Sequence, residues 1–265
     1  MAGELVFVGL GLWDARDVSV RGREAIARAD EVFLEGYTSF LGGADRAALE
    51  AFHGRRIVRL DREAVEDGSA ILAAARERRV ALLVVGDPMA ATTHVDLRIR
   101  AQRRGIPTRV VPGASIVTTA AGLLGLQSYK FGRATTVPFT RPGYEPESPY
   151  EVVAANRSRG LHTLVLLDIE AREGRFLRAD EALRFLLSVE ARRKEQALSP
   201  EGTVCVVARA GSDDPGLFAG PAASLAHMDF GPPLHAIVVP GALHELEAEA
   251  LRVLCRWPDG SKAGP

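Results

Sequence analysis

Residues 80–94 read VALLVVGDPMAATTH, and this stretch decides how the chain is expected to fold. The apolar run that opens it predicts a strand buried on both faces, as in a parallel sheet. The run ends abruptly in Gly86-Asp87-Pro88, and two threonines and His94 follow. A plain strand-to-helix turn would explain this ending. A ligand loop would explain it too, because open α/β sheets bind ligands at the carboxyl ends of their strands.

The sequence on either side of this stretch alternates between short apolar runs and amphipathic runs. Strands are expected at about residues 4–8, in EVFLE (31–35), in RIVRL, at 80–85 and in PTRVV. Helices are expected in VRGREAIARA, capped by Ser19, and in ADRAALEAF, SAILAAARER, THVDLRIRAQRR and GASIVTTAAGLLG. Such alternation with short turns is typical of βαβ units and a parallel sheet. The loops GLGLWD, GDPMAATTH and PGASI should therefore meet at one edge of that sheet.

A second α/β pattern begins after FTRPGYEPESPY, a segment whose prolines and glycines predict a loop. Strands are expected in LHTLVLLDIE, TVCVVARAG and LHAIVVPG, and helices in ADEALRFLLSVEARRKEQ and ALHELEAEALRVLCRW. We therefore predict an α/β protein with an N-terminal α/β domain over residues 1–125 and a C-terminal α/β domain over residues 126–265.

The composition is that of a globular protein and argues against nucleic-acid or membrane partners. The chain is 47% hydrophobic and 25% charged, and its net charge of −1 gives no global basic field. The N-terminus lacks the pattern of a signal peptide, and no apolar run approaches the roughly 20 residues of a membrane helix. Cys205 and Cys255 have no metal-ligand spacing and make no disulfide framework. A cytoplasmic protein without a metal site is expected.

Familiar catalytic motifs do not account for the candidate loops. Gly9-Leu10-Gly11 suggests a dinucleotide site, but Asp14 stands where that fingerprint has its third glycine. The sequence contains neither a P-loop lysine motif nor a G-x-S-x-G nucleophile turn. Asp87 could accept hydrogen bonds from a ligand or from local backbone N–H groups, and both alternatives stay open.

Short polar side chains at the predicted helix starts have an equally plain explanation. Thr92 or Thr93 is expected to cap the helix that follows, and Ser115 is expected to cap the next one. A helix N-terminus can also offer its free N–H groups to a ligand carboxylate. His94, and a lone histidine such as His235 beside an apolar strand, are most simply structural.

Several longer motifs resemble the diphthine synthases, a family of archaeal and eukaryotic members within the tetrapyrrole-methylase superfamily. The matching stretches are FVGLGLWDARDVSVRG, LEGYTSF, VVGDPMAATTHVDLRIRA, the SI of PGASI, YKFGRATTVPF, RGLHTLVLLDI, VVARAGS and HAIVVPGALHELEAEAL. They follow one another in the expected order, and GDPMAATTH together with YKFG is the most specific part. FTRPGYEPESPYEVV matches least, so no residue there is assigned a role.

The resemblance implies a tetrapyrrole-methylase-like fold, with S-adenosyl-L-methionine in a cleft between two α/β domains and usually a homodimer. It implies methylation of the amino group of a 3-carboxy-3-aminopropyl-histidine on translation elongation factor 2, leaving S-adenosyl-L-homocysteine. In archaeal members this implies trimethylation to diphthine, a stage of diphthamide biosynthesis. The family's cofactor contacts fall here on eight residues: Leu12, Asp87, Ala90, Ser115, Ile116, Leu167, Ala210 and His235. The resemblance assigns neither a general base nor a metal ligand.

Three other functions stay open at this point. The first is a methyltransferase of the same superfamily that acts on a corrin precursor. The second is a dinucleotide-dependent oxidoreductase, which Asp14 disfavours. The third is a module that binds S-adenosyl-L-methionine without turnover. An assay with elongation factor 2 against a tetrapyrrole separates the first from diphthine synthesis, and cofactor binding separates the second.

Overall fold

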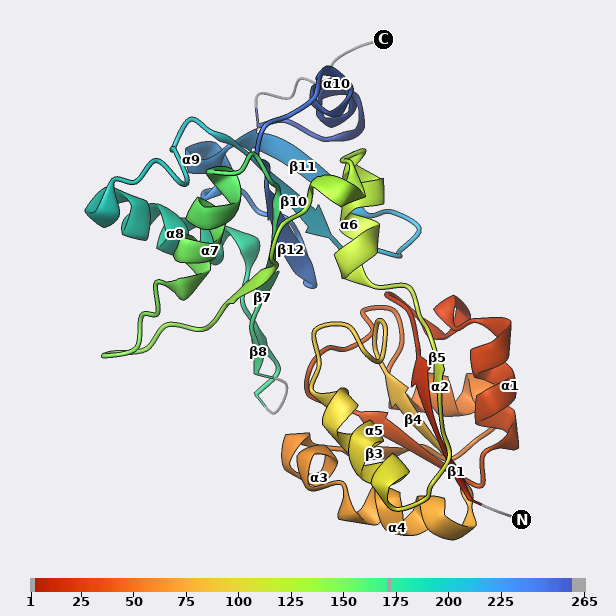
Figure 1. The fold of residues 1–265 in the computed structure, drawn as a ribbon. Helices are drawn as coiled ribbons and strands as arrows, with labels where there is room; N and C mark the ends of the chain where they lie inside the picture. Colours follow the sequence, from red (N-terminus) through yellow and green to blue (C-terminus); the bar gives the residue numbers. More distant parts are fainter. Residues whose placement is uncertain (1–2, 171–172, 259–265) are drawn as a thin grey trace. The chain divides into compact units, whose positions relative to one another are not determined.

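The computed structural model describes residues 3–170 and 173–258 and shows two compact units, each with its own sheet (Figure 1). The first unit runs to Ile116 and includes Glu170–Gly174; the second comprises Val117–Ile169 and continues from Arg175. The sequence suggested a division after residue 125, whereas these units divide at the start of helix α6 (Ile116–Leu124). The end of this helix packs on the second unit, because a Cβ atom on Gly125 would lie 2.5 Å from Ala250 Cβ.

The first unit contains the predicted parallel sheet, in the strand order β3-β2-β4-β1-β5. Its strands are β1 (Glu4–Gly9), β2 (Glu31–Glu35), β3 (Val58–Leu60), β4 (Arg79–Val84) and β5 (Thr108–Val111). β4 lies at the centre of the sheet, and its side chains enter two separate cores. Ala81 and Leu83 belong to one core, whereas Leu82 belongs to the other. The prediction of a strand buried on both faces is confirmed.

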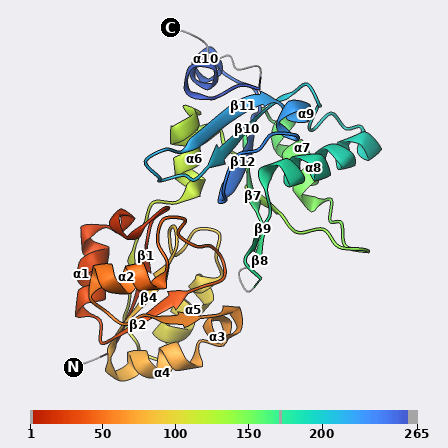
Figure 2. The ribbon, with the colours of Figure 1, turned by 180° about the vertical axis from the view of Figure 1, so that it is seen from behind.

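Helices cover both faces of this sheet (Figures 1 and 2). The helical elements of the unit are η1 (Ala15–Asp17), α1 (Val20–Arg28), α2 (Arg46–His53), α3 (Arg62–Asp67), α4 (Ser69–Glu77) and α5 (His94–Arg103). α1 and α2 contribute to one core, and α4 and α5 contribute to the other. Ser19 caps α1 by accepting a hydrogen bond from Gly22 N at 3.1 Å, as predicted. Asp45 caps α2 in the same way, one residue before the helix begins.

The second unit has a mixed sheet in the order β11-β10-β12-β7-β6, in which only β6 and β7 run parallel. Its strands are β6 (Thr135–Val137), β7 (Thr163–Leu167), β10 (Thr203–Ala208), β11 (Gly216–Pro221) and β12 (His235–Val239). A separate two-stranded sheet pairs β9 (Arg175–Phe176) with β8 (Ile169–Glu170), whose second residue is assigned to the first unit. Its helices, besides α6, are η2 (Ser128–Lys130), α7 (Ser148–Arg157), α8 (Ala179–Arg193), α9 (Ala222–Leu225) and α10 (Glu245–Leu254).

The predicted loop FTRPGYEPESPY was wrong at its end, because Ser148, Pro149 and Tyr150 form the first turn of α7. Proline is well tolerated there, since the first N–H groups of a helix have no partner within it. Tyr150 is fully buried, and its hydroxyl donates to Glu190 Oε2 on α8 at 2.8 Å. Burial and the neighbouring carboxylate raise the pKa of Tyr150 to about 12. Tyr150 therefore has a structural role in the second unit.

Candidate functional site

The three loops predicted to meet at one edge of the parallel sheet do meet, and glycines allow it. A Cβ atom on Gly9 would lie 2.5 Å from Gly113 N and 2.6 Å from the carbonyl oxygen of Gly86. Gly86 N donates to Gly11 O at 2.7 Å, and both residues have left-handed φ values of 79° and 82°. The backbones after β1, β4 and β5 therefore touch with no side chain between them.

Asp87 ties two of these loops together. Its Oδ1 accepts a hydrogen bond from Met89 N at 2.9 Å, and its Oδ2 accepts one from Gly113 N at 3.3 Å. The side chain is half-buried. The turn role that the sequence offered as one alternative is therefore present in the structure. It also extends across the sheet edge to the loop after β5, which the sequence did not indicate.

A buried histidine at the end of the GDPMAATTH loop hydrogen-bonds back to its start. His94 is 2% exposed, and its Nδ1 donates to the carbonyl oxygen of Pro88 at 3.0 Å. Its Nε2 lies 4.0 Å from Oε2 of Glu35, which is 1% exposed. Glu35 in turn accepts hydrogen bonds from Tyr37 N at 2.6 Å and Thr38 N at 2.7 Å. The structural role expected of His94 is confirmed, and sequence reasoning did not single out Glu35, a buried carboxylate that lies near the ring without a hydrogen bond to it.

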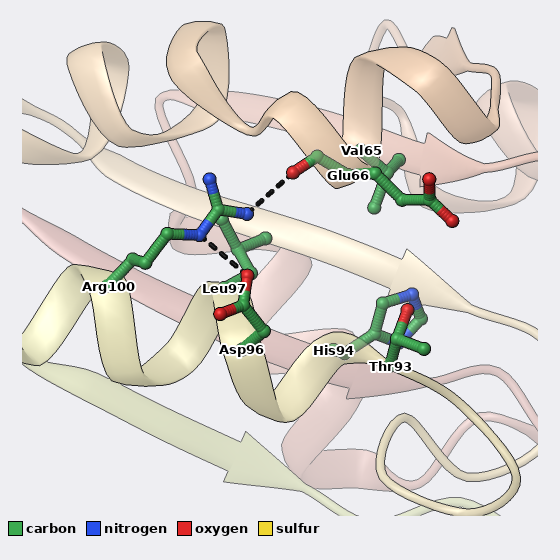
Figure 3. Close-up of a pocket in the computed structure, with 7 residues that line it drawn as sticks. All are labelled: Val65, Glu66, Thr93, His94, Asp96, Leu97 and Arg100. Atoms are coloured by element: carbon green, nitrogen blue, oxygen red, sulfur yellow. Dashed lines mark hydrogen bonds and ion pairs between the residues drawn. The ribbon is translucent and has the colours of Figure 1, made fainter.

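A pocket of about 250 Å³ lies beside His94, between α3 and α5 (Figure 3). Arg100 closes one end of it, donating to the carbonyl oxygens of Asp67 at 2.6 Å and Glu66 at 2.7 Å. Its Nε also lies 2.8 Å from a carboxylate oxygen of Asp96 (Figure 3). The guanidinium of Arg100 therefore joins α5 to α3, and its role in this pocket is structural.

The expected threonine cap of α5 is present only in a weak form. Thr93 occupies the N-cap position, but its side chain makes no capping hydrogen bond. Thr92 Oγ1 accepts from His94 N at 3.5 Å and donates to Pro88 O at 3.2 Å. Thr92 therefore braces the loop more than it caps the helix.

The GLGLWD turn after β1 is closed by a residue that the sequence did not single out. Asp17 Oδ2 accepts hydrogen bonds from Leu12 N at 3.1 Å and Trp13 N at 2.7 Å. Asp14 caps the short helix η1, so no dinucleotide-type helix opens at Gly11. The argument against a dinucleotide fingerprint is confirmed.

The three assigned residues of the second unit share one end of its sheet. Leu167 is the last residue of β7, and β12, which runs antiparallel to β7, begins at the same end with His235. β10 runs antiparallel to β12 with Ala208 opposite His235, and Ala210 follows two residues later. Because these adjacent strands run antiparallel, Leu167, His235 and Ala210 lie at or just beyond neighbouring strand ends on one side of the sheet.

The ring of His235 is committed to contacts within its own unit. Its Nδ1 accepts a hydrogen bond from Ala179 N at 3.3 Å, so its Nε2 carries the proton and donates to Pro232 O at 3.1 Å and Gly231 O at 3.2 Å. Burial lowers the pKa of His235, which favours the neutral imidazole. The ring is structural in this arrangement, and a ligand contact at this position would involve other atoms of the residue.

None of the eight assigned residues is exposed. Ser115 is 9% exposed and His235 is 7% exposed. The others are half-buried: Leu12, Asp87, Ala90, Ile116, Leu167 and Ala210. Leu12, Asp87, Ala90, Ser115 and Ile116 lie in the first unit, where Ser115 directly precedes α6. Within residues 3–170 and 173–258, no group of three or more His, Cys, Asp or Glu is placed to hold a metal ion.

Lys130 of the YKFG motif belongs to a buried polar network in the second unit. Glu247 on α10 is 1% exposed and accepts hydrogen bonds from Gln127 N at 2.9 Å, His244 N at 2.8 Å and His162 Nε2 at 3.0 Å. Lys130 Nζ pairs with the same carboxylate and donates to Ala242 O at 2.6 Å. Four donors thus meet one buried carboxylate, which joins α10 to η2 and to the segment before β7.

Comparison with known proteins identifies the family. The sequence profile of the Tetrapyrrole (Corrin/Porphyrin) Methylases matches residues 4–226. The chain belongs to the tetrapyrrole methylase family. Among its relatives, a diphthine synthase from Methanothermobacter thermautotrophicus is 47% identical over 247 residues, covering 93% of this chain and 94% of the relative. One from Methanocorpusculum labreanum is 49% identical, covering 93% of this chain and 97% of the relative.

Solved structures give the same result for the fold. A crystal structure of diphthine synthase matches with a TM-score of 0.87 and 39% sequence identity, covering 97% of this chain and 98% of that one. The predicted α/β tetrapyrrole-methylase fold is confirmed, and so is the resemblance read from the motifs. Membership of this family makes the chain a methyltransferase, not a dinucleotide-dependent oxidoreductase. No helix of the described residues is both long and apolar enough to span a membrane.

Proposed function

We propose that the protein uses S-adenosyl-L-methionine to methylate the amino group of the 3-carboxy-3-aminopropyl-histidine of translation elongation factor 2. The product would be diphthine after three transfers, a stage of diphthamide biosynthesis. The observation that carries this proposal is the 47% identity, over 93% of the chain, to a protein named diphthine synthase. The motif GDPMAATTH adds support, because its loop is built by buried contacts at a sheet edge.

The residues of the first unit fit a nucleoside cofactor. Gly9 and Gly113 bring bare backbone together, because a Cβ atom on either residue would clash with the main chain of the neighbouring loops. Asp87 supplies a half-buried carboxylate beside this backbone, and the N-terminus of α6 follows Ser115 with N–H groups that suit a carboxylate. We propose Leu12, Ala90, Ile116, Leu167, Ala210 and the backbone of His235 as the remaining cofactor contacts.

S-adenosyl-L-methionine, when bound, supplies a methyl carbon on a positively charged sulfur. The task of the chain is then to hold the substrate amine in line with that carbon, an effect worth roughly 7–11 kcal/mol in favourable cases. The amine must also lose its proton, and its pKa falls when it is moved out of water. His235 is engaged through both ring nitrogens, so the proposal assigns it no proton transfer.

The same proposal includes the protein substrate, the oligomeric assembly and the cellular compartment of the enzyme. Elongation factor 2 is its protein substrate, a homodimer its assembly and the cytoplasm its compartment. Sedimentation of the purified protein tests the assembly, and a mass equal to one chain would refute it.

The deciding experiment is mass spectrometry of elongation factor 2 that carries the aminocarboxypropyl histidine, after incubation with the protein and S-adenosyl-L-methionine. A gain of three methyl groups is expected. Fewer methyl groups would refute trimethylation alone. No gain, with the cofactor still bound, would refute the proposed substrate, and a tetrapyrrole should then be tested in the same assay.

Asp87→Ala gives a separate test of the cofactor site. Its affinity for S-adenosyl-L-methionine, measured by calorimetry, should fall, because the variant loses both a carboxylate and the link between Met89 and Gly113. Full affinity would show that Asp87 is not part of the site.

A further inference from the structure

Within residues 3–170 and 173–258, four residues other than glycine have a left-handed backbone: Ala91, Lys194, Gln196 and Arg209. This conformation is strained for a residue that carries a Cβ atom. Two of the four adjoin proposed cofactor contacts, because Ala91 follows Ala90 and Arg209 precedes Ala210. Strain of this kind persists where the surrounding structure holds it, and it gathers at functional sites. Of these two residues, Arg209 has the side chain that can hold its own turn in place.

Arg209 directly follows β10 and opens a tight turn. Its φ is 53°, and its carbonyl oxygen accepts a hydrogen bond from Ser212 N at 3.1 Å. Ala210 and Gly211, whose φ is 89°, are the two central residues of this turn. The conformation of Arg209 therefore sets the direction in which the backbone of Ala210 leaves the sheet.

The side chain of Arg209 crosses to a neighbouring segment of the second unit. Its Nη1 donates to the carbonyl oxygen of Phe230 at 2.8 Å. Two glycines flank the guanidinium, since a Cβ atom on Gly231 would lie 2.9 Å from Nη1 and one on Gly216 would lie 3.2 Å from Nη2. The half-buried guanidinium is thus held between the start of β11 and the segment that follows Phe230.

The same segment, residues 230–232, also holds His235. The Nε2 atom of His235 donates to Pro232 O at 3.1 Å and to Gly231 O at 3.2 Å. The rings of Phe230 and His235 pack edge to face, with their centres 5.9 Å apart. Residues 230–232 therefore connect the turn at Ala210, through Arg209, with the start of β12 at His235.

We propose that Arg209 is a positioning residue for the cofactor, whose side chain holds the turn at Ala210 in place relative to His235 through residues 230–232. The inference rests on the proposed function, which assigns Ala210 and the backbone of His235 to S-adenosyl-L-methionine. A glycine at position 209 would adopt the same φ without strain, but it has no side chain to donate to Phe230 O. The turn would then become ordered only when the cofactor binds, and the cost of this ordering lowers the affinity.

The test compares the wild-type protein with Arg209→Gly, Arg209→Lys and the control Lys194→Gly. Lys194 follows α8 in the same unit and has the same left-handed backbone, with a φ of 57°, but it is exposed. Calorimetry gives the affinity of each protein for S-adenosyl-L-methionine. Urea unfolding without the cofactor gives the stability of each protein.

Arg209→Gly should weaken the affinity for S-adenosyl-L-methionine about 10- to 100-fold, the loss typical of a hydrogen bond to a charged group. Its urea midpoint should stay close to that of the wild type, because relief of the backbone strain offsets the lost hydrogen bond. Arg209→Lys keeps a long cationic side chain with N–H donors, so it should recover part of the affinity. Lys194→Gly should keep the wild-type affinity, since it removes the same strain away from the proposed contacts.

The outcomes separate this inference from the proposed function. If the wild-type protein does not bind S-adenosyl-L-methionine, the proposed function fails and this inference fails with it. If the wild type binds the cofactor but transfers no methyl group to elongation factor 2, the proposed substrate is wrong, and the affinities of the variants still decide the role of Arg209. Unchanged affinity in Arg209→Gly, or no recovery in Arg209→Lys, overturns the inference alone. So does an Arg209→Gly variant that fails to fold or loses stability together with affinity, because that is the behaviour of a residue that supports only the fold.

Discussion

Replacing Glu247 with glutamine tests whether the buried network around YKFG stabilises the second unit. Glutamine keeps the shape of the side chain but replaces one acceptor oxygen with an N–H donor and removes the charge. Each carboxylate oxygen now faces two donors, Gln127 N and His162 Nε2 on one side and His244 N and Lys130 Nζ on the other. Whichever oxygen is replaced, the two N–H donors that face it lose their acceptor. The largely buried ammonium group of Lys130 also loses its negatively charged partner.

The expected loss of folding stability in Glu247→Gln follows from the shift in the pKa of the Glu247 carboxyl group. Burial alone would raise the pKa of Glu247, but the hydrogen bonds from His244, Lys130, Gln127 and His162 outweigh it and lower the pKa from 4.5 to about 2. At about 1.4 kcal/mol for each pKa unit, this amounts to roughly 3 kcal/mol of folding stability. The folded pKa is depressed, so this contribution is fully present above pH 4.5 and is lost as the pH falls toward 2.

The assay is urea unfolding followed by tryptophan fluorescence in a Trp13→Phe background. The chain has two tryptophans, and this change leaves Trp257, whose Nε1 donates to Leu251 O on α10 at 3.1 Å. Glu247→Gln should lower the free energy of unfolding at pH 7 by about 3 kcal/mol, and the difference from wild type should narrow below pH 4.5. Glu249→Gln, an exposed change on the same helix, is the control and should stay within about 0.5 kcal/mol. A loss no larger than that of the control would refute the reasoning, and so would a pH-independent loss.

Two further substitutions, one of them with a matched control, test other parts of the structure. Gly113→Ala would place a Cβ atom 2.4 Å from Gly86 O, so we expect a loss of about 1–3 kcal/mol in thermal or urea unfolding together with weaker binding of S-adenosyl-L-methionine. Gly122→Ala, inside α6 with no atom within 4 Å of the new Cβ, should instead be neutral or stabilising by up to about 1 kcal/mol. Tyr150→Phe should cost about 1–3 kcal/mol of unfolding free energy, because Glu190 loses a buried donor, and it should leave cofactor affinity unchanged. Unchanged stability in Gly113→Ala or Tyr150→Phe would contradict the packing described here.

Features that depend on a few consecutive residues could be predicted from the sequence. The apolar run at 80–85 predicts a strand buried on both faces, since neighbouring side chains in a strand point to opposite sides. Ser19 predicts a helix start, because a short side-chain oxygen reaches the N–H groups of the next turn. The order of the motifs was also sufficient to identify the family and its fold.

The tertiary structure decided what depends on residues far apart in the chain. The second sheet is mostly antiparallel, and its strands show the same apolar runs that a parallel sheet would. Glu247 meets Lys130 across 117 positions, and neither residue indicates the other in the sequence. The contact of Gly9 with Gly113 and the hydrogen bond from Ala179 N to His235 Nδ1 are of the same kind. Periodicity and capping act within one or two turns of chain, whereas these contacts exist only once packing has brought separate segments together.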